Sequence, residues 1–165
     1  MMKLEAVILA MVLCGLPCAA QAKDDRYVET LACIGGPFGL GVPPTYSALR
    51  KLGPIEREAT AVPDGPADGK AVRRAIWFPG LVLDLYSFPD QPERYLLASA
   101  TITDPRWTLA GPLHVGQTLD DARQHLAALG VTLGPSLSLG GDGDTITLKL
   151  SGNAISEIDY SCYTG

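Results

Sequence analysis

The chain has 165 residues, a formal net charge of −5 at pH 7 and 47% hydrophobic residues. A chain of this length suits one domain or two half-domains that share a core. The acidic balance and the lack of a Lys/Arg stripe exclude a basic nucleic-acid-binding protein.

The first residues contain the three parts of a secretory signal peptide in the right order. Lys3 supplies positive charge, residues 6–16 form an apolar run, and residues 20–22 have a small-x-small cleavage pattern. The run is far shorter than the roughly 20 residues that a membrane-spanning helix needs. We therefore expect a signal peptide over residues 1–22 and a mature protein that works in the periplasm without stable membrane insertion.

A lipid anchor is the alternative, because Cys14 and Cys18 lie in this segment. Leu13 and Pro17 precede these cysteines, whereas lipoprotein signals place a small residue there. We therefore expect no anchor.

Two further cysteines, Cys33 and Cys162, lie near the two ends of the mature chain. An exported protein with two cysteines most simply forms one disulfide. Loop-entropy reasoning assigns such a bridge roughly 4 to 5 kcal/mol of stabilisation. The competing interpretation is a free catalytic thiol.

A weak internal repeat relates residues 36–53 to residues 111–130. Each copy has Gly-Pro, a short apolar stretch, a threonine, a leucine-bearing segment and a closing glycine. In the first copy, Thr45 is the expected cap of about two helical turns that bury Leu49 and Leu52.

Strand-forming sequence follows the first helix. Residues 71–78, 81–88 and 95–103 are rich in apolar, aromatic and β-branched residues, and prolines and glycine separate them. The segment 63–69, rich in Pro, Gly and Asp, predicts a loop within this first half.

The second copy predicts a clearer helix. Thr118 can cap it, Asp121 completes a capping box, and Gly130 suits the C′ position. Helical spacing places four apolar residues on one buried face: Leu119, Ala122, Leu126 and Leu129.

Residues 145–150 and 154–163 predict a hairpin across the turn 151–153. Ile146, Leu148 and Leu150 alternate with polar residues, which is typical of an antiparallel sheet with one buried face. Ile158, Tyr160 and Cys162 share the inward face of the second strand. The sequence thus predicts an α+β fold of two tandem helix-plus-antiparallel-sheet modules, residues 23–107 and 108–165, in one compact domain with one disulfide.

The stretches 115–122, 129–130 and 148–158 resemble a pattern shared by beta-lactamase-inhibitor-like proteins and the SmpA/OmlA group of bacterial envelope proteins. The tandem arrangement is more similar to the former. The first half departs from the pattern, because its helix lacks an acidic start and its strands are longer. The resemblance implies a protein that binds other proteins through its sheet and loops, without catalytic residues.

Metal and cofactor chemistry has little support. His114 and His125 have no partners at zinc-ligand spacing, and Asp121 at i−4 makes a surface pair the plain interpretation for His125. Asp142 and Asp144 could offer oxygens to calcium, but residues 140–145 lack the length and distal glutamate of an EF-hand loop. A turn before the hairpin explains them equally well.

Enzyme motifs are also missing from the sequence. The glycine-rich residues 35–41 lack the Lys-Ser/Thr of a phosphate loop, and no Gly-x-Ser-x-Gly elbow or Cys-His arrangement is present. We expect neither an enzyme nor a bound cofactor.

Aromatic residues in the first half predict a binding surface instead. Tyr86 and Phe88 alternate with the leucines of residues 81–85, so with Trp77 and Tyr95 we expect a half-exposed aromatic patch. Arginines at 73, 74, 94 and 106 lie nearby in sequence, and Arg and aromatic residues are enriched at binding hot spots. The competing interpretation is that these rings cover the other side of a small sheet.

The leading hypothesis is an exported inhibitor or immunity protein that blocks an envelope or secreted enzyme, such as a basic cell-wall hydrolase or toxin. The loops at residues 63–69 and 140–145 are further candidate contacts. The expected partner-binding residues are Trp77, Tyr86, Phe88, Tyr95, Arg106, Asp142 and Asp144. The alternatives are an envelope-assembly accessory protein and a hydrolase with an unrecognised site.

Overall fold

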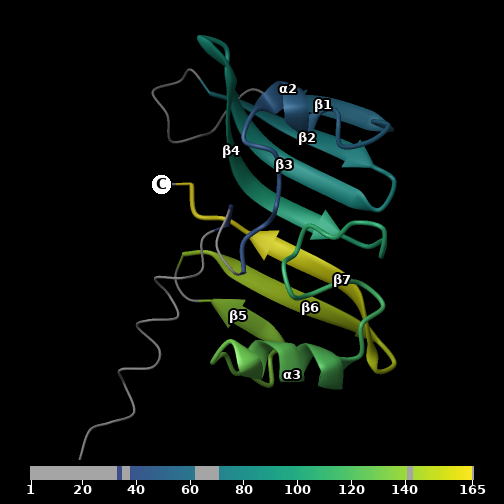
Figure 1. Cartoon of the computed structure of the whole chain (residues 1–165). Helices are drawn as coiled ribbons and strands as arrows, with labels where there is room; N and C mark the ends of the chain where they lie inside the picture. The colour runs from purple at the N-terminus through teal and green to yellow at the C-terminus, as the bar shows by residue number, and fades with distance from the viewer. Residues whose placement is uncertain (1–32, 35–37, 62–70, 141–142, 165) are drawn as a thin grey trace, which may run out of the picture.

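One antiparallel sheet runs through the described part of the chain (Figure 1). The computed structural model describes residues 33–34, 38–61, 71–140 and 143–164, so residues 1–22 and the segment 63–69 lie outside it. Seven strands follow the spatial order β1-β2-β3-β4-β7-β6-β5. They are β1 (Arg57–Ala61), β2 (Val72–Phe78), β3 (Leu81–Phe88), β4 (Gln91–Ile102), β5 (Ser138–Gly140), β6 (Thr145–Ser151) and β7 (Ala154–Ser161). The predicted α+β class is confirmed.

The two halves of the chain meet in the middle of this sheet. β4 pairs with β7 from Ser99↔Ser161 to Ile102↔Ile158. Each half therefore contributes a helix and a set of strands, and the sheet is continuous between the halves.

The first described helix, α2 (Tyr46–Leu49), is shorter than the predicted two turns. Thr45 caps it as expected, and Leu49 is fully buried. The amides of Lys51 and Leu52 then donate to carbonyls three residues back, which tightens the chain and ends the α-helical pattern before Gly53.

The second helix, α3 (Leu119–Ala128), follows its sequence signals closely. The Thr118 hydroxyl accepts from the Asp121 amide at 3.1 Å, and Gly130 has a φ of 79° at the C-terminal turn. Leu119, Ala122 and Leu126 are buried, but the expectation for Leu129 is wrong, since this residue is 49% exposed. Leu129 is the C-cap, where the chain leaves the helical path.

Strand boundaries differ from prediction mainly in the first half. β1 and β5 were not predicted, and β4 begins at Gln91 rather than Tyr95. The pairing passes from Ser87↔Tyr95 to Phe88↔Gln91, so residues 92–94 have no pairing partners. This irregularity lets Pro92 lie within the strand, because no ladder hydrogen bond is required of it.

Both described helices cover the same face of the sheet, which we call the covered face (Figure 1). Leu49 of α2 and Leu126 of α3 belong to one apolar core with buried residues of β2–β7. Residues 38–44 also cross this face. Two strand tyrosines fix this segment, since the hydroxyl of Tyr95 donates to the Pro43 carbonyl and that of Tyr160 to the Phe38 carbonyl.

The predicted disulfide between Cys33 and Cys162 is confirmed, with 5.5 Å between the two Cα atoms. Asp144 strengthens the same junction, because its two carboxylate oxygens accept from the backbone amides of Cys33 and Tyr163, each at 2.7 Å. The two ends of the described chain are therefore held together. The described helices include none that is long and apolar enough to cross a membrane.

Candidate functional site

The other side of the sheet, which we call the open face, carries no helix or strand among the described residues. Strand alternation places every second side chain there, opposite the buried leucines of β3. On β1–β4 the open face consists of Arg57, Ala59, Arg73, Ala75, Trp77, Val82, Asp84, Tyr86, Leu96, Ser99 and Thr101. Small and polar side chains thus surround two aromatic rings.

Trp77 forms the apolar centre of one end of the open face. Its cross-strand neighbours are Arg57 on β1 and Val82 on β3. The Arg57 guanidinium lies 3.7 Å from the centroid of the Trp77 ring, which is a close cation–π contact. The arginine is exposed and the indole is partly exposed, so both are accessible from solvent.

Tyr86 lies further along β3, between Arg73 of β2 and Leu96 of β4. Arg73 is ion-paired with Asp84, and its Nε lies 3.1 Å from both carboxylate oxygens. The hydrogen bonds that Arg73 donates to the Asp84 carboxylate raise the pKa of Arg73. The charges of this pair are therefore balanced within the chain.

The second half of the open face has a different chemistry. Lys149 lies between Glu157 and Asp159, with 3.1 Å from its Nζ to Asp159 Oδ2, and Thr101 donates to Asp159 Oδ1 at 2.8 Å. Burial raises the pKa of Asp159, but the hydrogen bonds from Thr101 and Lys149 outweigh it and leave this pKa below its ordinary value. This region is an internally satisfied polar network.

Two of the predicted aromatic residues are not half-exposed. Tyr95 is 8% exposed, because it pairs with Ser87 and shares the covered face, where burial raises its pKa to about 12. Phe88 is 7% exposed, and the Arg94 guanidinium lies 4.6 Å from its ring centroid. The partly exposed aromatic residues of the patch are therefore Trp77 and Tyr86.

Arg106 lies at the end of the sheet, beside a small pocket. Its guanidinium is paired with Asp104 at 2.8 and 2.9 Å, and the Arg106 contacts lower the pKa of that carboxyl. The pocket has a volume of about 270 Å³ and is lined by Leu52, Gly53, Pro54, Pro79, Arg106 and Trp107. Since Trp107 Nε1 donates to the Pro79 carbonyl at 2.7 Å, the pocket mainly presents apolar surface.

Of the two aspartates in the predicted 140–145 loop, the structure describes only one. Asp142 lies outside the described residues. Asp144 is described, and its carboxylate is occupied by the backbone amides at the disulfide. Within residues 33–34, 38–61, 71–140 and 143–164 no group of three or more His, Cys, Asp and Glu side chains could hold a metal ion.

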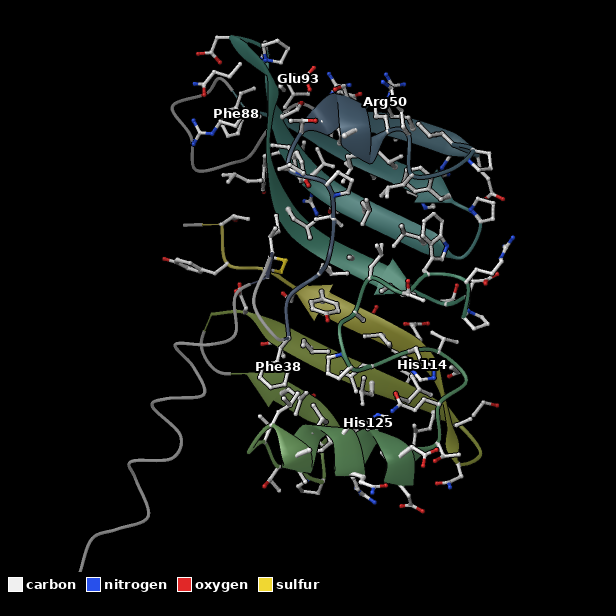
Figure 2. All side chains as sticks on the ribbon, in the orientation of Figure 1. Phe38, Arg50, Phe88, Glu93, His114 and His125 are labelled. Carbon is white, nitrogen blue, oxygen red and sulfur yellow. A yellow bond between two sulfur atoms is a disulfide. The ribbon has the colours of Figure 1, made fainter. Side chains whose placement is uncertain are left out.

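His114 lies in the segment before α3, and His125 lies in the last turn of this helix (Figure 2). The expected pair of His125 with Asp121 is not formed, because the Thr118 hydroxyl donates to the Asp121 carboxylate at 2.7 Å. Instead, His125 Nδ1 lies 2.9 Å from Nε2 of Gln117, whose Oε1 accepts from the His114 amide. Both contacts involve the buried amide of Gln117, so they hold the start of the helix in place.

An ionic cluster on the covered side of β1 was not predicted. Glu58 accepts from the Tyr46 hydroxyl at 2.9 Å and is paired with Arg50 at 3.0 Å and Arg74 at 3.3 Å. Burial, and then the hydrogen bond to Glu58, raise the pKa of Tyr46. Because these groups come from α2, β1 and β2, the cluster fixes the helix over the edge of the sheet (Figure 2).

The fold and surface together define a class of protein, an α+β domain with one face of its sheet covered by helices and an aromatic and arginine patch on the other. Comparison of the chain with protein-family models, curated proteins and solved structures finds no match. The tandem-module resemblance therefore stays a prediction, and a function has to be argued from the surface itself.

Proposed function

We propose that this is an exported, non-enzymatic protein that binds and blocks another protein through the open face of β1–β4. The observation that carries the proposal is the position of Trp77 and Tyr86, which lie accessible on this face with Arg57 and Arg73 beside them. Trp, Tyr and Arg are the residue types most enriched at the centres of protein interfaces.

The surroundings of the two rings favour a protein partner. Ala59, Ala75 and Ser99 have short side chains, so a partner can approach the sheet closely over an extended area. Protein interfaces combine such aromatic anchors with a polar rim that excludes water. The small pocket at Trp107 and Arg106 could accept one apolar side chain at the border of the same interface.

An oxidising compartment is consistent with the disulfide, which is characteristic of exported proteins. Together with the signal-like residues 1–22, it supports a periplasmic location. The net charge of −5 favours a basic partner, because long-range attraction accelerates encounter between oppositely charged proteins. We therefore propose an inhibitor or immunity protein for an envelope or secreted enzyme, such as a basic cell-wall hydrolase or toxin.

The test uses the oxidised mature protein, residues 23–165, as bait for envelope and culture-supernatant fractions. We expect a stoichiometric hydrolase whose activity falls on binding, and we expect the Trp77→Ala, Tyr86→Ala double variant to bind it at least about tenfold more weakly. Tyr163→Ala is the matched control, since Tyr163 is 73% exposed but lies beyond the end of β7.

Two outcomes would overturn the proposal. Capture of outer-membrane assembly components alone would replace it with the envelope-accessory function. Equal binding by the double variant and the parent protein would show that the open face is not the interface.

A further inference from the structure

Most arginines in the described part of the chain are already neutralised. Five of them form ion pairs with carboxylates, namely Arg50, Arg73, Arg74, Arg106 and Arg123. Arg94 has no carboxylate partner, but it hydrogen-bonds Gln91 and covers the buried ring of Phe88. Arg57 differs from all of these, because among the described residues its guanidinium forms no ion pair or hydrogen bond and lies over the Trp77 ring.

This isolation is notable on a chain that carries a net charge of −5. Carboxylates are more numerous than cations, and the neighbouring Arg73 and Asp84 form an ion pair on the same face. Glu58, the next residue after Arg57, points to the covered side and is occupied by Arg50 and Arg74. Among the described residues, Arg57 therefore has neither an anionic partner nor a hydrogen bond, whereas Arg94 at least bonds to Gln91.

Stacking on Trp77 also prepares this guanidinium for a ligand. The guanidinium carbon lies over the indole, 3.7 Å from the ring centroid, and no described residue accepts a hydrogen bond from its N–H groups. A guanidinium in this state matches the two oxygens of a carboxylate, and such bidentate pairs are stronger than neutral hydrogen bonds. Val82 and Ala75 continue the apolar surface beside the ring.

We propose that the Arg57–Trp77 pair is an anchor for a partner's Asp or Glu side chain, flanked by an apolar residue that packs on Trp77 and Val82. This inference rests on the proposed protein-binding function and specifies what the partner presents to the open face. The occupant is a protein carboxylate, because the net negative charge repels polyanions such as nucleic acid and anionic membranes. A single carboxylate on an otherwise basic partner avoids that repulsion.

The direct test is a titration of the ¹⁵N-labelled oxidised mature protein at low salt. The probes are an acetylated and amidated pentapeptide that alternates valine with glutamate, the same peptide with glutamine, and inorganic phosphate. The side-chain resonances to follow are Arg57 Nε–H and Trp77 Nε1–H. The indole of Trp107, which is bonded to the Pro79 carbonyl, is the internal reference.

We expect the glutamate peptide to shift both the Arg57 and Trp77 signals and the glutamine peptide to leave them in place. Arg57→Gln should weaken binding of the glutamate peptide by at least about fivefold, the equivalent of about 1 kcal/mol. Arg57→Lys should also weaken it, since lysine keeps the charge but not the planar fork. Arg123→Gln on α3 is the matched control and should bind as the parent does.

The anchor is wrong if the glutamine peptide gives equal shifts, if Arg57→Gln keeps full affinity, or if phosphate binds as tightly as the glutamate peptide. Its failure can be separated from failure of the protein-binding proposal. A captured partner that is lost in the Trp77→Ala, Tyr86→Ala variant but retained by Arg57→Gln would refute only the anchor. Peptide binding at Arg57 with no partner captured would refute only the inhibitor function.

Discussion

The two faces of strand β3 differ in burial and in residue chemistry. Leu81, Leu83 and Leu85 are each 0% exposed on the covered face, whereas Val82, Asp84 and Tyr86 alternate with them on the open face. The leucines are held by packing with helices and crossing segments. Their neighbours on the open face lie beside side chains of β2 and β4, as in the Arg73–Asp84 ion pair, but no described helix or strand covers them.

A second difference divides the open face itself. In β1–β4, aromatic rings and arginines lie among short side chains. In β6 and β7, Lys149, Glu157 and Asp159 satisfy one another. Under the proposed function, the binding surface lies in the first half of the sheet, and the polar network of β6 and β7 stabilises the second half.

The largest effect should come from removing the disulfide that closes the covered side. Cys33 and Cys162 pack against the core, and their bridge spans 129 residues of sequence. We expect the Cys33→Ala, Cys162→Ala variant to lose roughly 4 to 5 kcal/mol of unfolding free energy in urea titrations. A loss below about 1 kcal/mol would mean that the core and Asp144 alone hold the chain ends.

A neighbouring pair of substitutions tests the two faces directly. Leu85→Ala should cost about 3 kcal/mol of stability, because it leaves a cavity in a fully buried site. Tyr86→Ala, one residue along the same strand, should cost less than about 1 kcal/mol but weaken partner binding. Equal destabilisation by the two changes would show that the open face is packed against something in the folded protein.

A smaller, pH-dependent effect should come from Tyr95. Its folded-state pKa of about 12 exceeds the value of about 10 for an unfolded tyrosine, so the stabilisation is complete below pH 10 and is lost as pH rises towards 12. The parent should lose on the order of 1 kcal/mol from this residue by pH 11. The Tyr95→Phe variant should lack this part of the alkaline decline, measured by denaturation between pH 8 and pH 11; an unchanged decline would contradict the assignment.

Local sequence signals were enough to predict several helices and strands and the disulfide. The cap at Thr118 and the glycine at 130 define α3, and the alternation in residues 145–150 defines β6 with its buried face. The strand at 81–88 and the pairing of Cys33 with Cys162 were also predicted correctly. These features depend on short-range conformational preferences or on a simple count of cysteines.

The candidate site was only partly predictable. Trp77 and Tyr86 follow regular alternation and lie where the pattern placed them. Tyr95 does not lie on the predicted face. The register shifts between β3 and β4 decide the face on which its side chain lies. Arg57 was missed because β1 is a short edge strand of mixed composition. Its side chain becomes a candidate binding residue only because it contacts the Trp77 ring on the neighbouring strand.

By itself, the sequence determined the α+β class, the main helix, the central strands and the disulfide, since caps, periodicity and residue chemistry act over a few neighbouring positions. Only the tertiary structure decided that the two halves share one sheet through β4 and β7. It alone also decided that the two described helices cover one face and that Arg57 has no carboxylate partner among the described residues of the other. Those outcomes depend on strand register and long-range pairing, which bring together residues that no local pattern relates.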